Sequence, residues 1–232
     1  MNVLLVEPDY KNKFPPLGLL KIGAYHLHRG DKVRFFKGLL KRVDAEYFDR
    51  IYICTLFSFY HDKTVKTILH YKDLVNGDIR RIFVGGIYST LYPKVIYEAT
   101  GIYPIVGLLD RPGMLGADQE IVDRYPPAFK LLDQINYDYG TSNAFIAYAT
   151  RGCVNKCSFC AVPRLEPDFN DYIDIKPIVE DTKLRSGDKC HLILMDNNVL
   201  ASPRFPDIIA DIKAVGFGRG EKLNKKQRTV DF

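Results

Sequence analysis

In the first part of the chain, short hydrophobic runs alternate with segments whose hydrophobic residues recur at helical spacing. Four runs have the length of strands, at residues 2–6, 32–36, 50–57 and 81–84. Helical spacing follows the first and third runs, at Leu17, Leu20, Ala24 and Leu27 and at Val65, Ile68 and Leu69. Because nearly every position of each run is hydrophobic, we expect a parallel sheet covered on both faces. Residues 1–110 are therefore predicted to form a doubly wound, Rossmann-like α/β domain.

The second part follows a segment rich in Gly, Pro and Asp, residues 111–142, which we predict to be a linker. Beyond it, hydrophobic runs and helical spacing alternate again. Strands are expected at 144–150, 191–195 and 228–232, and helices at 173–184 and 205–215. At about 30 residues for each strand–helix–strand unit, residues 143–232 hold about three strands. A barrel of six or eight strands needs a longer chain, so we expect a fragment that stops inside its second domain.

Composition and charge add limits on the class of protein. Of the 232 residues, 47% are hydrophobic and 26% charged, which excludes disordered and fibrous classes. The sequence has neither a basic leader nor the ~20 consecutive hydrophobic residues of a membrane span, so we expect a cytoplasmic protein. The net charge is +5, and much of the excess lies in Lys222–Arg228. We interpret this tail as a solvated loop, with RNA binding as the alternative.

Three of the five cysteines lie within eight residues, in the segment Arg151-Gly-Cys153-Val-Asn-Lys-Cys157-Ser-Phe-Cys160. In a reducing compartment such clustering indicates metal binding rather than disulfides. Cysteine thiolates are the usual ligands of iron–sulfur clusters, and three of them leave one iron of a [4Fe–4S] cluster open to a substrate. Gly152 allows a sharp turn off the preceding strand, and Arg151 and Lys156 offer positive charge near the thiolates.

A structural zinc knuckle is the alternative, with Cys190 or His191 as the fourth ligand. Zinc sites usually contain two paired cysteine knuckles, whereas this chain has a single triple, so the cluster is favoured. With zinc, the chain would be a non-catalytic Rossmann-like module that contacts RNA through its basic tail. The two isolated cysteines, Cys54 and Cys190, lie in hydrophobic runs and are predicted to be buried.

The spacing Cys-x3-Cys-x2-Cys, with Phe159 before the last cysteine, resembles the radical S-adenosylmethionine superfamily. The resemblance implies a partial (β/α)6 barrel with a [4Fe–4S] cluster on Cys153, Cys157 and Cys160. It also implies reductive cleavage of S-adenosylmethionine to a 5′-deoxyadenosyl radical, with electrons from a donor such as flavodoxin or ferredoxin. Phe159 would lie near the adenine. Asp196 and Asn197 follow the second strand of the barrel, where family members contact the methionine amino group and the ribose, although the usual Gly-Gly-Glu is absent.

The first domain resembles the cobalamin-binding type that precedes many such enzymes, in Phe14-Pro-Pro-Leu-Gly-Leu-Leu20 and Val84-Gly-Gly-Ile87. The D-x-H-x-x-G motif that would supply a cobalt-ligating histidine is missing after the first strand. We therefore expect a degenerate domain that works without this cofactor, with cobalamin bound without a protein histidine as the alternative. The substrate and the residues that act on it are not predicted.

Overall fold

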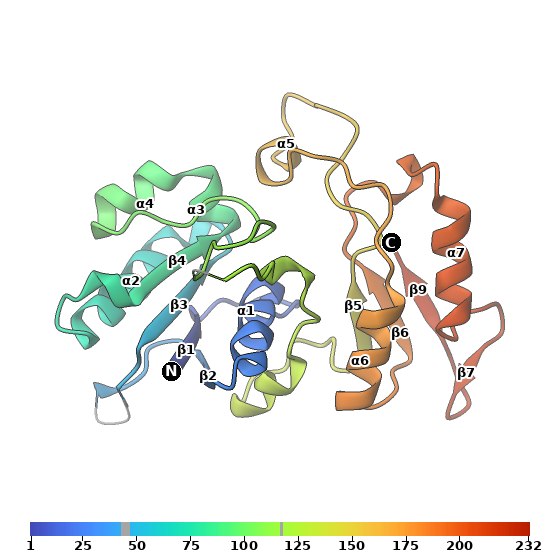
Figure 1. Cartoon of the computed structure of the whole chain (residues 1–232), viewed down its shortest axis with the longest axis horizontal. Helices are drawn as coiled ribbons and strands as arrows, with labels where there is room; N and C mark the ends of the chain where they lie inside the picture. The colour runs from blue at the N-terminus through green and yellow to red at the C-terminus, as the bar shows by residue number, and fades with distance from the viewer. Residues whose placement is uncertain (43–46, 117) are drawn as a thin grey trace. The chain divides into compact units, whose positions relative to one another are not determined.

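The computed structural model describes residues 1–42, 47–116 and 118–232 (Figure 1). The chain divides into two compact units, Met1–Tyr137 and Asp138–Phe232. No helix in the described part of the chain is long and apolar enough to cross a membrane.

The described residues of the first unit contain a sheet of four parallel strands in the order β2-β1-β3-β4. The strands are β1 (Asn2–Glu7), β2 (Lys32–Lys37), β3 (Arg50–Thr55) and β4 (Ile82–Gly86). Each coincides with a hydrophobic run of the sequence to within a few residues at its ends. In such a sheet, ligands bind beyond the carboxyl ends of the strands.

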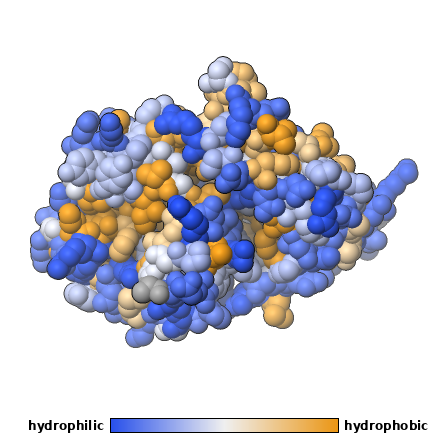
Figure 2. Space-filling model, turned by 45° about the horizontal axis from the view of Figure 1, so that its top comes forward, coloured by the Kyte–Doolittle hydropathy of each residue, from blue (hydrophilic) through white to orange (hydrophobic). Residues whose placement is uncertain are grey.

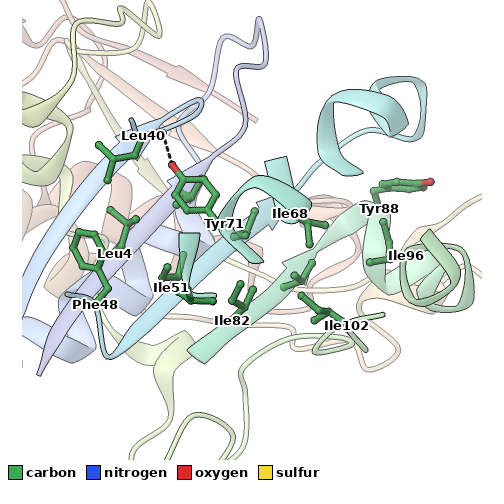
Figure 3. Close-up of a cluster of buried hydrophobic side chains, with 14 residues drawn as sticks. Leu4, Leu40, Phe48, Ile51, Ile68, Tyr71, Ile82, Tyr88, Ile96 and Ile102 are labelled. Carbon is green, nitrogen blue, oxygen red and sulfur yellow. Dashed lines mark hydrogen bonds between the residues drawn. The ribbon is translucent and has the colours of Figure 1, made fainter. Parts of the chain in front are cut away.

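Helices cover both faces of this sheet, as nearly continuous hydrophobic runs require. They are α1 (Leu17–His28), α2 (His61–Leu74), α3 (Ile87–Leu91) and α4 (Pro93–Thr100). Leu4 and Val6 of β1 pack into a cluster with α2, α3 and α4, whereas Val3 and Leu5 pack into a second cluster with α1. Figure 3 shows the first cluster, in which Tyr71 of α2 also accepts a hydrogen bond from the backbone N–H of Leu40 at 3.1 Å. The predicted doubly wound arrangement is therefore present.

Most of the segment that composition predicts to be a linker packs against the first unit. Leu115, Val122 and Leu131 are buried in the cluster that contains α1. Two 3-10 helices lie in this segment, η4 (Val122–Arg124) and η5 (Phe129–Gln134). Gly, Pro and Asp prevent long helices and strands here, but the hydrophobic residues between them still cover one face of the sheet. The boundary between the units falls after Tyr137, within the predicted linker of residues 111–142.

A buried ion pair closes the carboxyl end of the first sheet. The Glu7 carboxylate is fully buried and lies 2.7 Å from Nζ of Lys37, whose side chain is 6% exposed. These two residues are register partners at the ends of β1 and β2. Asn12 donates a further hydrogen bond to Glu7 at 2.9 Å, so the loop after β1 is attached to the same pair.

A buried histidine at the amino end of the same sheet leads to a pH prediction. His26 is fully buried, with Nδ1 2.7 Å from Asp31 and Nε2 3.0 Å from the Tyr52 hydroxyl. Burial lowers the pKa of His26 below 6.5, against the opposing effect of Asp31 and with a smaller contribution from Arg50 and Arg29. Below about pH 6.5 the unfolded chain therefore binds a proton that the folded chain does not. We expect the free energy of unfolding to fall as the pH drops from about 7 to about 5.

His26→Gln should flatten this pH dependence in chemical denaturation series, while His28→Gln on the exposed side of α1 should leave it unchanged. The lowered pKa of Asp31 contributes stability that is lost only below about pH 3.8, so it does not act in this window. An equally steep dependence in the His26→Gln protein would assign the effect to another group.

The described residues of the second unit hold three parallel strands in the order β5-β6-β9. They are β5 (Ala144–Ala147), β6 (His191–Leu194) and β9 (Thr229–Asp231), and the helices are α5 (Val162–Leu165), α6 (Lys176–Ser186) and α7 (Phe205–Ala214). Phe145, Leu192, Val179 and Ile208 belong to one buried cluster between the strands and helices. The predicted order of strand, cysteine loop, helix, strand and helix is therefore present.

The basic tail of the sequence forms a small hairpin between α7 and β9. Its strands are β7 (Lys222–Leu223) and β8 (Lys226–Gln227), joined by Asn224 and Lys225, which both have positive φ as a two-residue hairpin turn requires. Arg228 at its base lies 2.7 Å from Asp188 with only 8% of its side chain exposed. The Arg228 side chain therefore forms an ion pair within the second unit. Other short 3-10 helices are η2 (Ser58–Tyr60), η3 (Ile79–Arg81) and η6 (Val199–Ala201).

Candidate metal centre

The cysteine loop leaves the carboxyl end of β5 and ends at α5. Figure 1 shows this segment extending away from the sheet of the second unit, with α5 near its tip. The position agrees with the sequence prediction that the three cysteines follow the first strand of the second domain. Ligand-binding loops of parallel α/β folds lie at this end of the strands.

Gly152 makes the turn that starts the loop. Its φ of +72° is in the left-handed region, which L-residues with a side chain rarely adopt. A Cβ atom at this position would overlap the carbonyl oxygen of Asp168 and lie 3.1 Å from that of Glu166. The backbone of the loop thus returns very close to its own beginning, and the residue at position 152 has to be glycine.

None of the three cysteines is fully buried, and none is in a disulfide. Cys157 is exposed, and Cys153 and Cys160 are half-buried. The backbone N–H of Val162 donates to Sγ of Cys160 at 3.5 Å. The N–H of Asn155 donates to Sγ of Cys153 at 3.4 Å. Hydrogen bonds of this kind stabilise the negative charge that a thiolate carries as a ligand.

Cys153 receives a second hydrogen bond, from the side-chain amide of Asn198 at 3.4 Å. The bond from Asn155, followed by that from Asn198 and a smaller contribution from Lys156, lowers the pKa of the Cys153 thiol. Asn198 lies in the segment after β6 and Asn155 in the cysteine loop, so two separate parts of the chain donate hydrogen bonds that stabilise the Cys153 thiolate.

The three cysteine sulfurs are not gathered around one metal position in this structure. Within residues 1–42, 47–116 and 118–232, no three His, Cys, Asp or Glu side chains lie closely enough together to hold a metal ion. Three cysteines on one loop, with N–H donors to two of them, are the type of donor that iron–sulfur clusters use. The assignment of the ligands stays a prediction.

The topology separates the cysteine loop from the fourth ligands considered for zinc. Because β5 and β6 are parallel, His191 pairs with Ala144 at the amino end of β5, whereas the loop follows Ala147. At about 3.3 Å per residue, the two ends of β5 are already about 10 Å apart. Cys190 is buried at the same far end, and Nδ1 of His191 lies 2.7 Å from Oγ1 of Thr229. Neither residue can complete a zinc site with the three cysteines.

Asp196 connects the end of β6 to the end of β5. Its carboxylate accepts hydrogen bonds from the N–H of Ala149 at 3.1 Å, the N–H of Thr150 and the hydroxyl of Thr150 at 2.6 Å. Burial raises the pKa of Asp196, and these hydrogen bonds oppose the shift. The sequence predicts a cofactor contact for Asp196. Both of its carboxylate oxygens hold the strand that leads into the loop, and the cofactor contact stays a prediction.

The remaining predicted residues have different surroundings. Phe159, in the cysteine loop, is 92% exposed, so a planar ligand can reach its ring. The face drawn in Figure 2 carries hydrophobic residues in separate patches among hydrophilic ones. Asn197 donates a hydrogen bond to Glu166 at 3.0 Å. Arg151 is paired with Glu166 at 2.7 Å, and Lys156 donates to the carbonyl of Pro167 at 2.9 Å.

Known proteins were compared with the chain in sequence and in structure. No protein-family model matches the chain. A Methanocaldococcus jannaschii protein named as a candidate methylthiotransferase is 25% identical over 198 residues, which cover 74% of this chain and 43% of that protein. Among solved structures, the radical S-adenosylmethionine methyltransferase TsrM of Kitasatospora setae matches 92% of this chain and 51% of its own, with a TM-score of 0.60 and 16% identity. That structure contains a tryptophan substrate and an S-adenosylmethionine analogue.

The structural likeness shows that the chain shares the fold of a radical S-adenosylmethionine methyltransferase. This agrees with the resemblance to the radical S-adenosylmethionine superfamily that the cysteine motif indicates. The chain spans about half of the length of each of these two similar proteins. The α/β fold class predicted from the sequence is confirmed.

The structure reveals three polar residues near the cysteine loop that the sequence did not single out. Thr150 is fully buried beside Asp196, Asn198 contacts Cys153, and Glu166 contacts Arg151, Gly152 and Asn197. A signal was present for Glu166, which is the first acidic residue after the cysteines and precedes Pro167. Its partners could not be found from spacing, because Asn197 lies 31 residues away.

Proposed function

We propose that the chain is the cofactor-binding part of an enzyme that cleaves S-adenosylmethionine reductively with a [4Fe–4S] cluster on Cys153, Cys157 and Cys160. One observation carries the proposal. Three free thiols lie on a single loop at the carboxyl end of the first strand of the second unit, and backbone and amide N–H groups donate to two of them. The family supports the same assignment.

When bound, the cluster supplies the electron that cleaves S-adenosylmethionine, and a flavodoxin or ferredoxin is the proposed donor of that electron. The chain's own residues hold and orient the cofactors. The three cysteines hold the cluster, and Asn155, Asn198 and Val162 stabilise the ligating sulfurs by N–H donation. The exposed ring of Phe159 is the proposed contact of the adenine. Asn197 is the proposed contact of the ribose or methionine part, through its amide oxygen.

The class of reaction is proposed from the two proteins that the chain resembles. One is named as a candidate methylthiotransferase and the other is a methyltransferase. Both names describe transfer of a methyl-bearing group, so we propose methyl or methylthio transfer as the reaction of the whole enzyme. The substrate is not assigned.

We further propose that the first unit works without cobalamin. The end of β1 carries Glu7, whose carboxylate is bound by Lys37 and Asn12. His26 and His28 lie on α1, and His26 is fully buried against Asp31 and Tyr52. Neither histidine is placed at the carboxyl ends of the strands, where a ligand of this fold binds.

Anaerobic reconstitution of the chain with iron and sulfide tests the proposal. We expect a brown protein with about four iron atoms per chain, and formation of 5′-deoxyadenosine when dithionite and S-adenosylmethionine are added. A colourless protein that retains zinc would instead support the non-catalytic module. When cobalamin is added to the same preparation, its absorption spectrum should stay unchanged, and no cobalamin should remain with the protein after gel filtration. Retention of cobalamin would contradict only the proposal that the first unit works without it.

A further inference from the structure

One carboxylate holds both sides of the base of the cysteine loop. Oε1 of Glu166 lies 2.7 Å from Nη1 of Arg151. Oε2 accepts the backbone N–H of Gly152 at 2.7 Å and the amide of Asn197 at 3.0 Å. The side chains of Arg151 and Glu166 are each only 11% exposed. The hydrogen bonds from Arg151 and Gly152 are therefore partly shielded from water, whereas the one from Asn197 is exposed.

The partners of Glu166 are the residues on which the position of Cys153 depends. Gly152 immediately precedes Cys153 and has the left-handed conformation that turns the chain into the loop. Asn197 immediately precedes Asn198, whose amide donates to Sγ of Cys153. Glu166 therefore fixes the backbone from which this sulfur projects, and also the segment that supplies its side-chain donor.

Arg151 makes the carboxylate suitable for this position. A negative charge close to a thiolate-ligated cluster would oppose its reduction, but the guanidinium of Arg151 lies against Glu166 and also 3.9 Å from the ring centre of Tyr148. A charged acceptor forms stronger hydrogen bonds to N–H donors than a neutral one. The ion pair thus accepts strong hydrogen bonds from N–H donors while it carries little net charge.

Hydrogen bonds to ligating sulfurs are among the factors that set the reduction potential of an iron–sulfur cluster. They stabilise the reduced form, which carries the larger negative charge. We propose that Glu166 is a positioning residue that holds Cys153 and its Asn198 donor in place and thereby raises the reduction potential of the cluster. This inference rests on the proposed function for the cluster, whereas the positioning of the loop base can be measured without it.

The first experiment uses the chain without metal. Hydrogen exchange of peptides that cover residues 149–153 should be several-fold faster in Glu166→Ala than in the unchanged chain, because the Gly152 N–H loses its acceptor. Glu166→Gln keeps an acceptor oxygen and should show a smaller increase. Glu180→Gln, which removes the same charge from an exposed position on α6, is the matched control and should not change the exchange. Equal exchange in all four proteins would overturn the positioning role.

The second experiment uses the reconstituted protein. Redox titration followed by electron paramagnetic resonance should give a more negative cluster potential in the double variant Arg151→Ala/Glu166→Ala, which removes both charges of the pair, than in Glu180→Gln. Asn198→Ala should reproduce the shift in potential while leaving the exchange of residues 149–153 unchanged, because it removes only the donor. An unchanged potential in the double variant would overturn the inference. If the unchanged chain binds no cluster, the proposed function fails, and the exchange experiment still decides the positioning role.

Discussion

Replacing Cys157 by alanine should remove nearly all iron and sulfide from the reconstituted chain, and with them all formation of 5′-deoxyadenosine. The cluster needs a thiolate on each of three irons, and two thiolates from one loop cannot hold it. Cys157 is the exposed cysteine of the three, so its removal takes no side chain out of the core. The loss is therefore expected in a protein whose circular dichroism and unfolding transition are unchanged.

Cys190→Ala is the matched control for this prediction. It makes the same chemical change in the same unit, but at the buried amino end of β6, so iron and 5′-deoxyadenosine should be retained. Iron content is measured by a colorimetric assay and the nucleoside by chromatography. A Cys157→Ala protein with full iron content would mean that the loop is not the cluster site.

Gly152→Ala should prevent assembly of the cluster while all three cysteines remain. A residue with a side chain costs about 1–2 kcal/mol in the left-handed region. At this position its Cβ would also overlap the carbonyl oxygen of Asp168, a backbone atom that cannot turn away like the end of a flexible side chain. The chain must therefore change its path just before Cys153, and we expect iron incorporation to fall by at least about tenfold.

Gly140→Ala separates the cost of the left-handed backbone from the cost of the steric overlap. Gly140 also has positive φ, +71°, but nothing lies within 4 Å of the position its Cβ would take. The substitution should therefore cost about 1–2 kcal/mol of stability and leave iron incorporation intact. If the two variants load iron equally well, the close return of the loop onto Asp168 is not needed for the site.

The strands and main helices were predictable because burial leaves a direct mark on the sequence. β1 is hydrophobic at Val3, Leu4, Leu5 and Val6, and these residues do enter two clusters on opposite faces of the sheet. The helix over Leu17–His28 ends just before Gly30, whose positive φ fits the residue after a helix. Patterns of this kind depend only on near neighbours in the chain, and one sequence is enough to see them.

Residues 111–137 show where such patterns fail. Gly and Pro correctly exclude long regular elements there, but they do not report whether the irregular chain is free or packed. Leu115, Val122 and Leu131 are buried against α1, and that packing depends on the three-dimensional position of α1. Composition therefore predicted a linker where the chain covers one face of a sheet.

The candidate site divides in the same way. The three cysteines and Gly152 could be found because their spacing within one loop carries the chemistry. Asp196 could be found from its place after a strand, but its hydrogen-bond partners could not. Its partners Ala149 and Thr150 lie about 46 residues earlier, and only parallel pairing of β5 with β6 brings them together. Glu166 escaped notice for the same reason.

The ion pair between Glu7 and Lys37 has a consequence for how the first sheet selects its alignment. Sliding β2 by one residue would turn its side chains to the opposite faces, and hydrophobic burial alone rejects that error. Sliding β2 by two residues would return its side chains to the original faces, so hydrophobic burial distinguishes this alignment only weakly from the native one. The buried Glu7 carboxylate would then lose the Lys37 ammonium, at a cost of about 3–5 kcal/mol. A single pair of opposite charges thus disfavours the two-residue shift, which hydrophobic burial alone does not exclude.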